Sequence, residues 1–216
     1  MIKVENITKV FGDNIVLNDI SATFERGKTN LIIGQSGSGK TVLMKICIGL
    51  FEPDNGSVIF DDRQFSNTKE KFKSDIRKEM GVLFQGGALF DSMNVEQNVM
   101  FPLNMFTDLS YEEKLERVNF CLNRVNLNGI NDMMPSELSG GMMKRVAIAR
   151  AISNSPKYLF CDEPNSGLDP LTAELIDELI SEITQEFNIT TIINTHDMNS
   201  VLKIGQTINF LYNGKL

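Results

Sequence analysis

A glycine-rich turn between an apolar strand and a helix limits the folds open to this chain more than any other segment. The run Gly34-Gln35-Ser36-Gly37-Ser38-Gly39-Lys40-Thr41 has the spacing Gly-x-x-x-x-Gly-Lys-Thr and follows the apolar residues 31–33. Glycines let the backbone curl so that several N–H groups converge on one anion, and the start of the following helix adds positive partial charge. A turn that only capped a helix would explain the glycines but not the Lys-Thr pair. The segment therefore predicts a phosphate-binding loop in an α/β fold.

The side chains of this loop suit a nucleoside triphosphate with Mg²⁺. Lys40 would neutralise the outer phosphates, and Thr41 would offer its hydroxyl to the metal ion. We therefore expect ATP and Mg²⁺ as cofactors. The predicted nucleotide-binding residues of the loop are Gly34, Ser36, Gly37, Ser38, Gly39, Lys40, Thr41 and Val42.

Composition narrows the class of protein. The 216 residues are 42% hydrophobic, enough for one domain with a sizeable core, and the net charge of -7 leaves no basic surface for nucleic acid. Cys47, Cys121 and Cys161 are far apart in the sequence, which favours buried thiols in a reducing compartment over disulfides or a zinc site. We find no signal-peptide pattern and no apolar run near the ~20 residues of a spanning helix. A cytosolic protein is expected, with any membrane role depending on a partner.

The pattern of apolar residues predicts two kinds of sheet and a helical insert. Residues 2–24 alternate apolar and polar positions, as antiparallel strands do. Apolar runs at 31–33, 81–84, 158–161, 190–194 and 207–212, mostly separated by helical patterns, favour a mainly parallel sheet. From residue 86 to about 155 helical spacing replaces the strand signal, and Ser110-x-x-Glu113 has the form of a capping box. We predict a single α/β domain, residues 1–216, with an N-terminal antiparallel β subdomain and a helical subdomain inserted at roughly 86–155.

Two carboxylates follow the apolar run at 158–161. Asp162 and Glu163 would lie at the carboxyl end of a parallel strand, which is the usual ligand edge of an open α/β sheet. Asp162 suits Mg²⁺, and Glu163 would polarise the attacking water. Acids are also common in surface turns, so the pair is informative mainly because a phosphate-binding loop precedes it.

A second anion site is predicted at Ser139-Gly140-Gly141. Ser139 is placed to cap the following helix, and two glycines would expose backbone donors in its first turn. An ordinary capped helix would not need glycines there, because they weaken it.

With these motifs the chain resembles the ATPases of the ABC transporter family over nearly its whole length. Leu138-Ser139-Gly140-Gly141 looks like the family signature, and Ser166-Gly167-Leu168-Asp169 looks like its D-loop. The resemblance implies that Phe11 stacks on adenine. It also implies that Gln85 is the Q-loop glutamine, with a catalytic and a Mg²⁺-binding role. His196 is then the catalytic switch histidine near the γ-phosphate; the residue also follows an apolar strand, so it should lie at the same sheet edge as Asp162.

The family resemblance also implies an assembly. The fold would be a P-loop NTPase of ABC type, working as a homodimer with ATP at the interface, so that Ser139, Gly140 and Gly141 complete the partner's site. Integral-membrane permease subunits would dock in a groove after Gln85, for which Leu89 and Phe90 are candidates. The protein would then lie peripherally on the cytoplasmic face of the inner or plasma membrane, with no nucleic-acid partner.

Further segments look most like the phospholipid-trafficking ATPases associated with Mla and Mce systems: residues 87–90, 101–103 and 135–142, where Met142 replaces the usual glutamine. This resemblance implies lipid cargo and a lipid-binding Mce-type subunit. The same apolar residues could equally form the core of the helical subdomain. Lipoprotein release, small-solute import and cell division remain alternative ABC systems. A soluble ABC protein acting on ribosomes or nucleic acid, and a P-loop kinase or GTPase, are further alternatives that co-purification with a membrane protein would exclude.

Overall fold

The computed structural model describes residues 1–216 and contains a five-stranded parallel sheet in the order β6-β7-β8-β3-β9. Every pairing in this sheet is parallel, which confirms the prediction. The five carboxyl ends therefore meet at one edge, where ligands bind in such sheets. The strands are β3 (Thr29–Ile33), β6 (Met80–Leu83), β7 (Tyr158–Asp162), β8 (Thr190–Thr195) and β9 (Thr207–Phe210).

A second, antiparallel sheet has the order β2-β1-β4-β5. The predicted antiparallel strands at residues 2–24 are β1 (Ile2–Phe11) and β2 (Asn14–Phe24), which pair with each other. The other two strands, β4 (Asn55–Phe60) and β5 (Arg63–Gln64), were not predicted. Only Val58 and Phe60 of β4 are buried, and β5 has two residues, so neither strand carries enough alternation to be recognised in the sequence.

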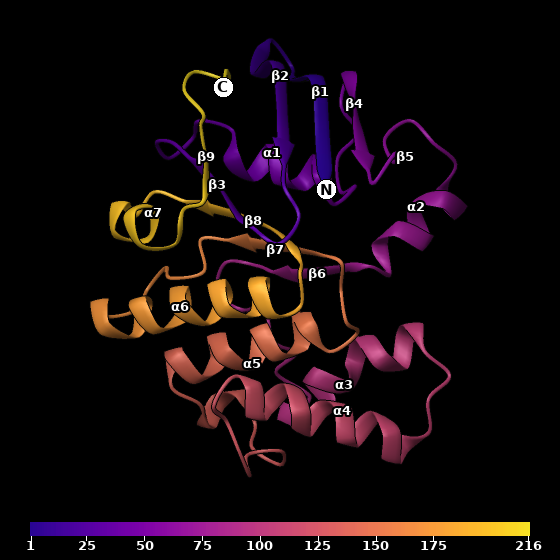
Figure 1. The fold of residues 1–216 in the computed structure, drawn as a ribbon, viewed down its shortest axis with the longest axis vertical. Helices are drawn as coiled ribbons and strands as arrows, with labels where there is room; N and C mark the ends of the chain where they lie inside the picture. The colour runs from indigo at the N-terminus through magenta and orange to yellow at the C-terminus, as the bar shows by residue number, and fades with distance from the viewer.

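The helices divide between the two sides of the parallel sheet (Figure 1). Helix α1 lies with the antiparallel sheet on one side, and α3, α4, α5 and α6 lie on the other. Two hydrophobic clusters, of 20 and 28 buried residues, fill these two layers. The helices are α1 (Lys40–Cys47), α2 (Glu70–Arg77), α3 (Val95–Phe106), α4 (Tyr111–Arg124), α5 (Gly140–Ile152), α6 (Pro170–Glu186) and α7 (Met198–Ile204), with a 3₁₀ turn at Pro135–Glu137.

The segment predicted to be a helical insert contains α3, α4 and α5, between β6 and β7. Helix α4 begins with the predicted capping box: Glu113 N–H donates to Ser110 Oγ at 3.2 Å, and Ser110 N–H donates to Glu113 Oε2 at 2.8 Å. The three cysteines are buried free thiols, as predicted. None of the helices combines the length and the apolar character needed to cross a bilayer.

Candidate functional site

The phosphate-binding loop connects β3 to α1 and forms one wall of a cavity of about 580 Å³. Lys40 Nζ is buried and donates to the carbonyl oxygens of Gly34 and Gln35, at 2.8 and 3.1 Å. Ser38 Oγ is buried without a hydrogen-bond partner. A Cβ at Gly34 would lie 2.3 Å from the Leu211 carbonyl oxygen, so only glycine fits there. A buried ammonium and an unpaired hydroxyl beside a curled backbone are suited to an anionic ligand.

Thr41 and Asp162 meet at the carboxyl edge of the sheet. The Thr41 hydroxyl lies 3.2 and 3.3 Å from the two Asp162 carboxylate oxygens. Hydroxyl and carboxylate oxygens are ligands that Mg²⁺ prefers, so this pair fits the ion. Asn194, which pairs with Asp162 in the β7–β8 register, donates from Nδ2 to Asp162 Oδ1 at 3.0 Å. Sequence reasoning missed Asn194, although a polar residue at the end of the apolar run 190–193 was the available signal.

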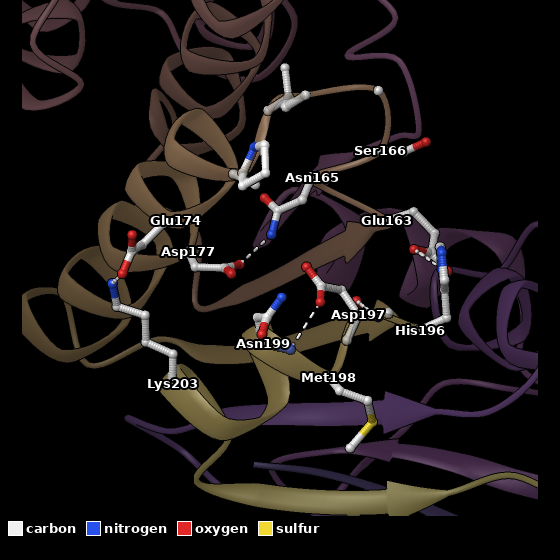
Figure 2. A pocket seen from close by; sticks show the side chains of 15 residues that line it. Glu163, Asn165, Ser166, Glu174, Asp177, His196, Asp197, Met198, Asn199 and Lys203 are labelled. Atoms are coloured by element: carbon white, nitrogen blue, oxygen red, sulfur yellow. Dashed lines mark hydrogen bonds and ion pairs between the residues drawn. The ribbon is translucent and has the colours of Figure 1, made fainter.

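Glu163 lies between Lys40 and His196. Its Oε2 is 2.8 Å from His196 Nδ1, and its Oε1 is 3.9 Å from Lys40 Nζ. Figure 2 shows the Glu163 and His196 side chains facing each other. Glu163 has a φ of 49°, a left-handed conformation that costs roughly 1 kcal/mol or more for a residue with a side chain. Its N–H donates to the Asn194 carbonyl at 3.0 Å, so the β8 strand holds this backbone in place.

Gln85, Glu163 and His196 all line the cavity beside the phosphate-binding loop. Gln85 follows β6 and its Nε2 donates to Ser166 Oγ at 3.4 Å. The structure therefore brings together Glu163, predicted from the end of an apolar run, and Gln85 and His196, whose roles the family resemblance implied. Val16 of β2 also lines this cavity and was not predicted.

Phe11 does not line this cavity. Its ring packs edge-on against Phe51, with the centroids 5.5 Å apart, and its side chain is 43% exposed. The Lys9 ammonium lies 5.3 Å from the Phe11 ring centroid. The adenine-stacking role of Phe11 stays a prediction.

A second cavity, of about 670 Å³, lies between α6, α7 and the loop that follows Glu163 (Figure 2). Asn165 of this loop donates from Nδ2 to Asp177 Oδ1 at 2.7 Å and to Ser200 Oγ at 3.1 Å. Burial raises the pKa of the Asp177 carboxyl, although the hydrogen bonds from Ser200 and Asn165 oppose the shift. Asp177 thus fastens the Glu163 loop to α6. No signal in the sequence connects these residues, because they lie on different elements.

Ser139 caps α5 as predicted, with its Oγ accepting from Met142 N–H at 3.3 Å. Ser139, Gly140 and Gly141 do not line the cavity of the phosphate-binding loop. The argument that a glycine in the first turn of α5 indicates an anion site is wrong for Gly141. A Cβ at Gly141 would lie 2.8 Å from Thr172 Cγ2 on α6, so close packing within the chain already requires this glycine. Gly140 has no such neighbour, because its nearest atom would be Leu168 Cδ2 at 3.7 Å.

An apolar groove of about 490 Å³ lies between β6, α3 and α5. Its lining includes Phe84, Phe90, Phe101 and Phe106, and the Phe90 side chain is 40% exposed. Leu89 does not line the groove, and its partly buried side chain packs against the hydrophobic cluster of the helical layer. Of the two docking candidates, Phe90 lies in this groove and Leu89 does not, and docking at either residue stays a prediction.

Comparison with known proteins identifies the family. A family model described as "ABC transporter" matches residues 17–166. The "Probable ribonucleotide transport ATP-binding protein mkl" of Mycobacterium tuberculosis is 38% identical over 211 residues, which are 98% of this chain and 59% of that protein. The chain therefore spans less than two thirds of the length of this relative.

Two further relatives have other names. The "Intermembrane phospholipid transport system ATP-binding protein MlaF" of Escherichia coli is 38% identical over 204 residues, covering 94% of this chain and 76% of MlaF. The "Methionine import ATP-binding protein MetN" of Campylobacter jejuni is 39% identical over 232 residues, covering all of this chain and 69% of MetN.

Solved structures of ABC transporter cassettes have the same fold as this chain. The dimeric structure of MJ0796, described as a bacterial ABC transporter cassette, superposes with a TM-score of 0.91 at 32% identity and covers 100% of this chain and 96% of its own. The same protein in a dimeric post-hydrolysis state bound to ADP and Pi gives a TM-score of 0.90. With its phosphate-binding loop and carboxylate edge, the chain belongs to the ABC transporter family.

Proposed function

We propose that this chain is the ATPase subunit of a membrane transporter, with residues 1–216 acting as one domain. The observation that supports this most is the convergence of Lys40, Glu163 and His196 on one cavity, beside the Thr41–Asp162 pair. Lys40 would exchange its two carbonyl partners for the outer phosphates. Thr41, Asp162 and Gln85 would hold Mg²⁺, which supplies charge neutralisation at the phosphates.

Glu163 would orient and polarise the attacking water in this cavity. Its carboxylate faces Lys40 on one side and His196 on the other, which puts it beside the ammonium that would neutralise the outer phosphate. His196 would fix the Glu163 side chain and contact the γ-phosphate. Phosphoryl transfer requires mainly such positioning and charge stabilisation from the protein.

The working form would be a homodimer with head-to-tail ATP sites. Ser139 and the Gly140 N–H lie outside the cavity of their own chain, so their donors can serve a nucleotide only if a second chain brings one. The solved relative MJ0796 is itself dimeric. In a two-fold pair, each Ser139 loop would approach the γ-phosphate held by the partner's Lys40.

Mixing two inactive variants tests this arrangement. Lys40→Ala damages the phosphate loop and Ser139→Arg damages the opposing loop. In an equal mixture half of the dimers are mixed, and each mixed dimer keeps one of its two sites intact. ATPase activity should therefore recover to about one quarter of the parental value if one intact site suffices. Normal hydrolysis by the Ser139→Arg protein alone would show that the site does not need a second chain.

The partner would be an integral-membrane permease that inserts an apolar segment into the groove lined by Phe90 and Phe106. Proteins commonly recognise an amphipathic helix by binding its apolar face in a hydrophobic groove, and aromatic rings that line such a groove become buried on binding. The names of mkl, MlaF and MetN all describe transport systems. The chain would then act peripherally, at the cytoplasmic face of the membrane.

Phospholipid is the proposed cargo, with a Mce-type lipid-binding subunit in the same assembly. Support comes from the similarity to MlaF and from the segments 87–90, 101–103 and 135–142. The similar identity to MetN keeps small-solute import as the alternative.

Capture from detergent-solubilised membranes, followed by identification of the bound protein and lipid, tests both partner and cargo. Phe106→Asp should abolish capture of the permease. Phe120→Asp on α4 is the matched control, because the two rings are 43% and 44% exposed but Phe120 lies outside the groove. Capture that survives Phe106→Asp would place the docking site elsewhere, and co-purified amino acid instead of lipid would favour the alternative cargo.

A further inference from the structure

Arg150, near the end of α5, is a buried cation without a carboxylate partner. Its side chain is 9% exposed, and burial alone shifts its pKa, downward from the ordinary value. The guanidinium remains charged because arginine does not lose its proton in proteins. A buried charge needs compensating hydrogen bonds. Arg150 Nη1 donates to the Ala88 carbonyl and Nη2 to the Gly87 carbonyl, both at 2.8 Å.

The carbonyls that Arg150 holds belong to an unusual stretch of backbone. Gly86, Gly87 and Ala88 have φ angles of 82°, 83° and 47°, three left-handed residues in succession. Gly86 is exposed, whereas Gly87 is buried: a Cβ there would lie 3.4 Å from the Ala147 Cβ of α5, and the Gly87 N–H donates to the Phe84 carbonyl at 2.9 Å. Ala88 adopts this conformation at a cost that glycine avoids. The two hydrogen bonds from Arg150 fix the carbonyl side of this stretch, at Gly87 and Ala88.

This stretch joins the nucleotide cavity to the apolar groove. Gln85, immediately before it, lines the nucleotide cavity. Phe90, two residues after Ala88, lines the groove, and its ring lies 5.7 Å from the Arg150 guanidinium. Asn98 fixes the Phe90 backbone by accepting from its N–H at 2.8 Å and donating to its carbonyl at 3.1 Å. Arg150 itself also lines the groove.

We propose that Arg150 is a positioning residue that couples the apolar groove to Gln85. An apolar segment entering the groove contacts Phe90 and displaces its ring against the guanidinium. Because the guanidinium holds two consecutive carbonyls in a planar fork, the displacement passes to Gly87, two residues from Gln85. The permease as the occupant rests on the function proposed above, whereas the coupling inside the chain can be measured without it.

Coupling is reciprocal, so nucleotide binding must change the groove if the groove acts on Gln85. The chain has no tryptophan, so Phe106→Trp provides a single fluorescent reporter in the groove. The reporter is combined with Glu163→Gln to stop turnover, and Mg²⁺-ATP is titrated. We expect a saturable emission change. In Arg150→Lys, which keeps the charge but cannot span both carbonyls, most of the amplitude should be lost.

Arg117→Lys is the matched control for this experiment. Arg117 donates to the Ile152 and Ser153 carbonyls, at 3.0 and 2.8 Å, and lies 4.9 Å from the Phe120 ring centroid. It thus makes the same kinds of contact in the same subdomain, away from Gln85, and its replacement should leave the response intact. An undiminished response in Arg150→Lys would overturn the proposal, and so would the absence of any response while Arg150 is intact.

A double-mutant cycle on kcat separates coupling from simple loss of stability. Arg150→Lys should lower kcat about tenfold, equal to about 1.4 kcal/mol, while the KM for ATP changes less than about twofold because the phosphate-binding loop is untouched. In the Gln85→Ala background the same replacement should have little further effect, since the residue through which it acts is gone. Additive losses would overturn the proposal. If Phe106→Asp leaves membrane capture unchanged but the reporter response still depends on Arg150, the permease assignment fails and the coupling stands.

Discussion

Two adjacent glycines open helix α5, and their different surroundings lead to opposite predictions for the same substitution. Alanine in place of glycine stabilises a helix by about 0.5–1 kcal/mol when there is room for the methyl group. At Gly140 the nearest atom to a new Cβ would be Leu168 Cδ2 at 3.7 Å, which is ordinary contact. Gly140→Ala should therefore be neutral or stabilising by up to about 0.5 kcal/mol in this first turn.

At Gly141 the new Cβ would lie 2.8 Å from Thr172 Cγ2. The neighbour is a β-branched side chain on another helix, with little freedom to move away. Overpacking of this kind costs about 1–3 kcal/mol, which exceeds the gain in helix propensity. We expect Gly141→Ala to destabilise the chain by about 1–2 kcal/mol, equivalent to a fall in Tm of about 2–8 °C for a domain of this size.

Urea unfolding followed by circular dichroism measures both effects. Thr172→Ser removes the Cγ2 atom, so the cost of Gly141→Ala should largely disappear in that background. Equal effects of the two alanines, or a cost that Thr172→Ser does not relieve, would refute the packing argument. ATPase activity provides the second readout: Gly140→Ala keeps the backbone N–H but adds a methyl group beside it, so turnover should fall without loss of stability if the partner's nucleotide approaches this turn closely.

The remaining predictions concern three charged residues. Lys40→Ala should abolish ATP binding or nearly so, because the triphosphate charge would lack its buried ammonium. If calorimetric titration shows that the variant binds ATP with ordinary affinity, this assignment is wrong. Glu163→Gln should keep ATP binding and stop turnover, since an amide cannot polarise water, and hydrolysis at the parental rate would exclude Glu163 as the catalytic carboxylate. Burial raises the pKa of Asp177, so its contribution to stability is fully present below the unfolded pKa, near 3.9, and is lost as pH rises through the folded pKa. Asp177→Asn should therefore gain stability relative to the parent as pH is raised from about 4, and parallel pH profiles of the two proteins would count against this account.

The candidate site could be predicted from the sequence because its parts are local. The spacing from Gly34 to Thr41 imposes the loop, and Asp162 and His196 each follow an apolar run at the end of a strand. Parallel strands bring such ends to one edge, where Asp162 and Glu163 were expected; Asp162 lies against Thr41 there, and Glu163 Oε1 lies 3.9 Å from Lys40 Nζ. Capping at Ser110 and Ser139 was predictable for the same reason, because a cap involves only the next three residues.

Tertiary packing decided the rest. Leu89 and Phe90 are adjacent and both apolar, yet Leu89 packs against the hydrophobic cluster of the helical layer and Phe90 lines the groove. Gly141 is glycine because Thr172 of another helix lies against it, and β4 is a strand because β1 pairs with it. Arg150 contacts carbonyls 62 and 63 residues away. Spacing in the sequence determines which groups share a turn or a strand end, but it does not determine which side chain of a distant element fills the remaining volume.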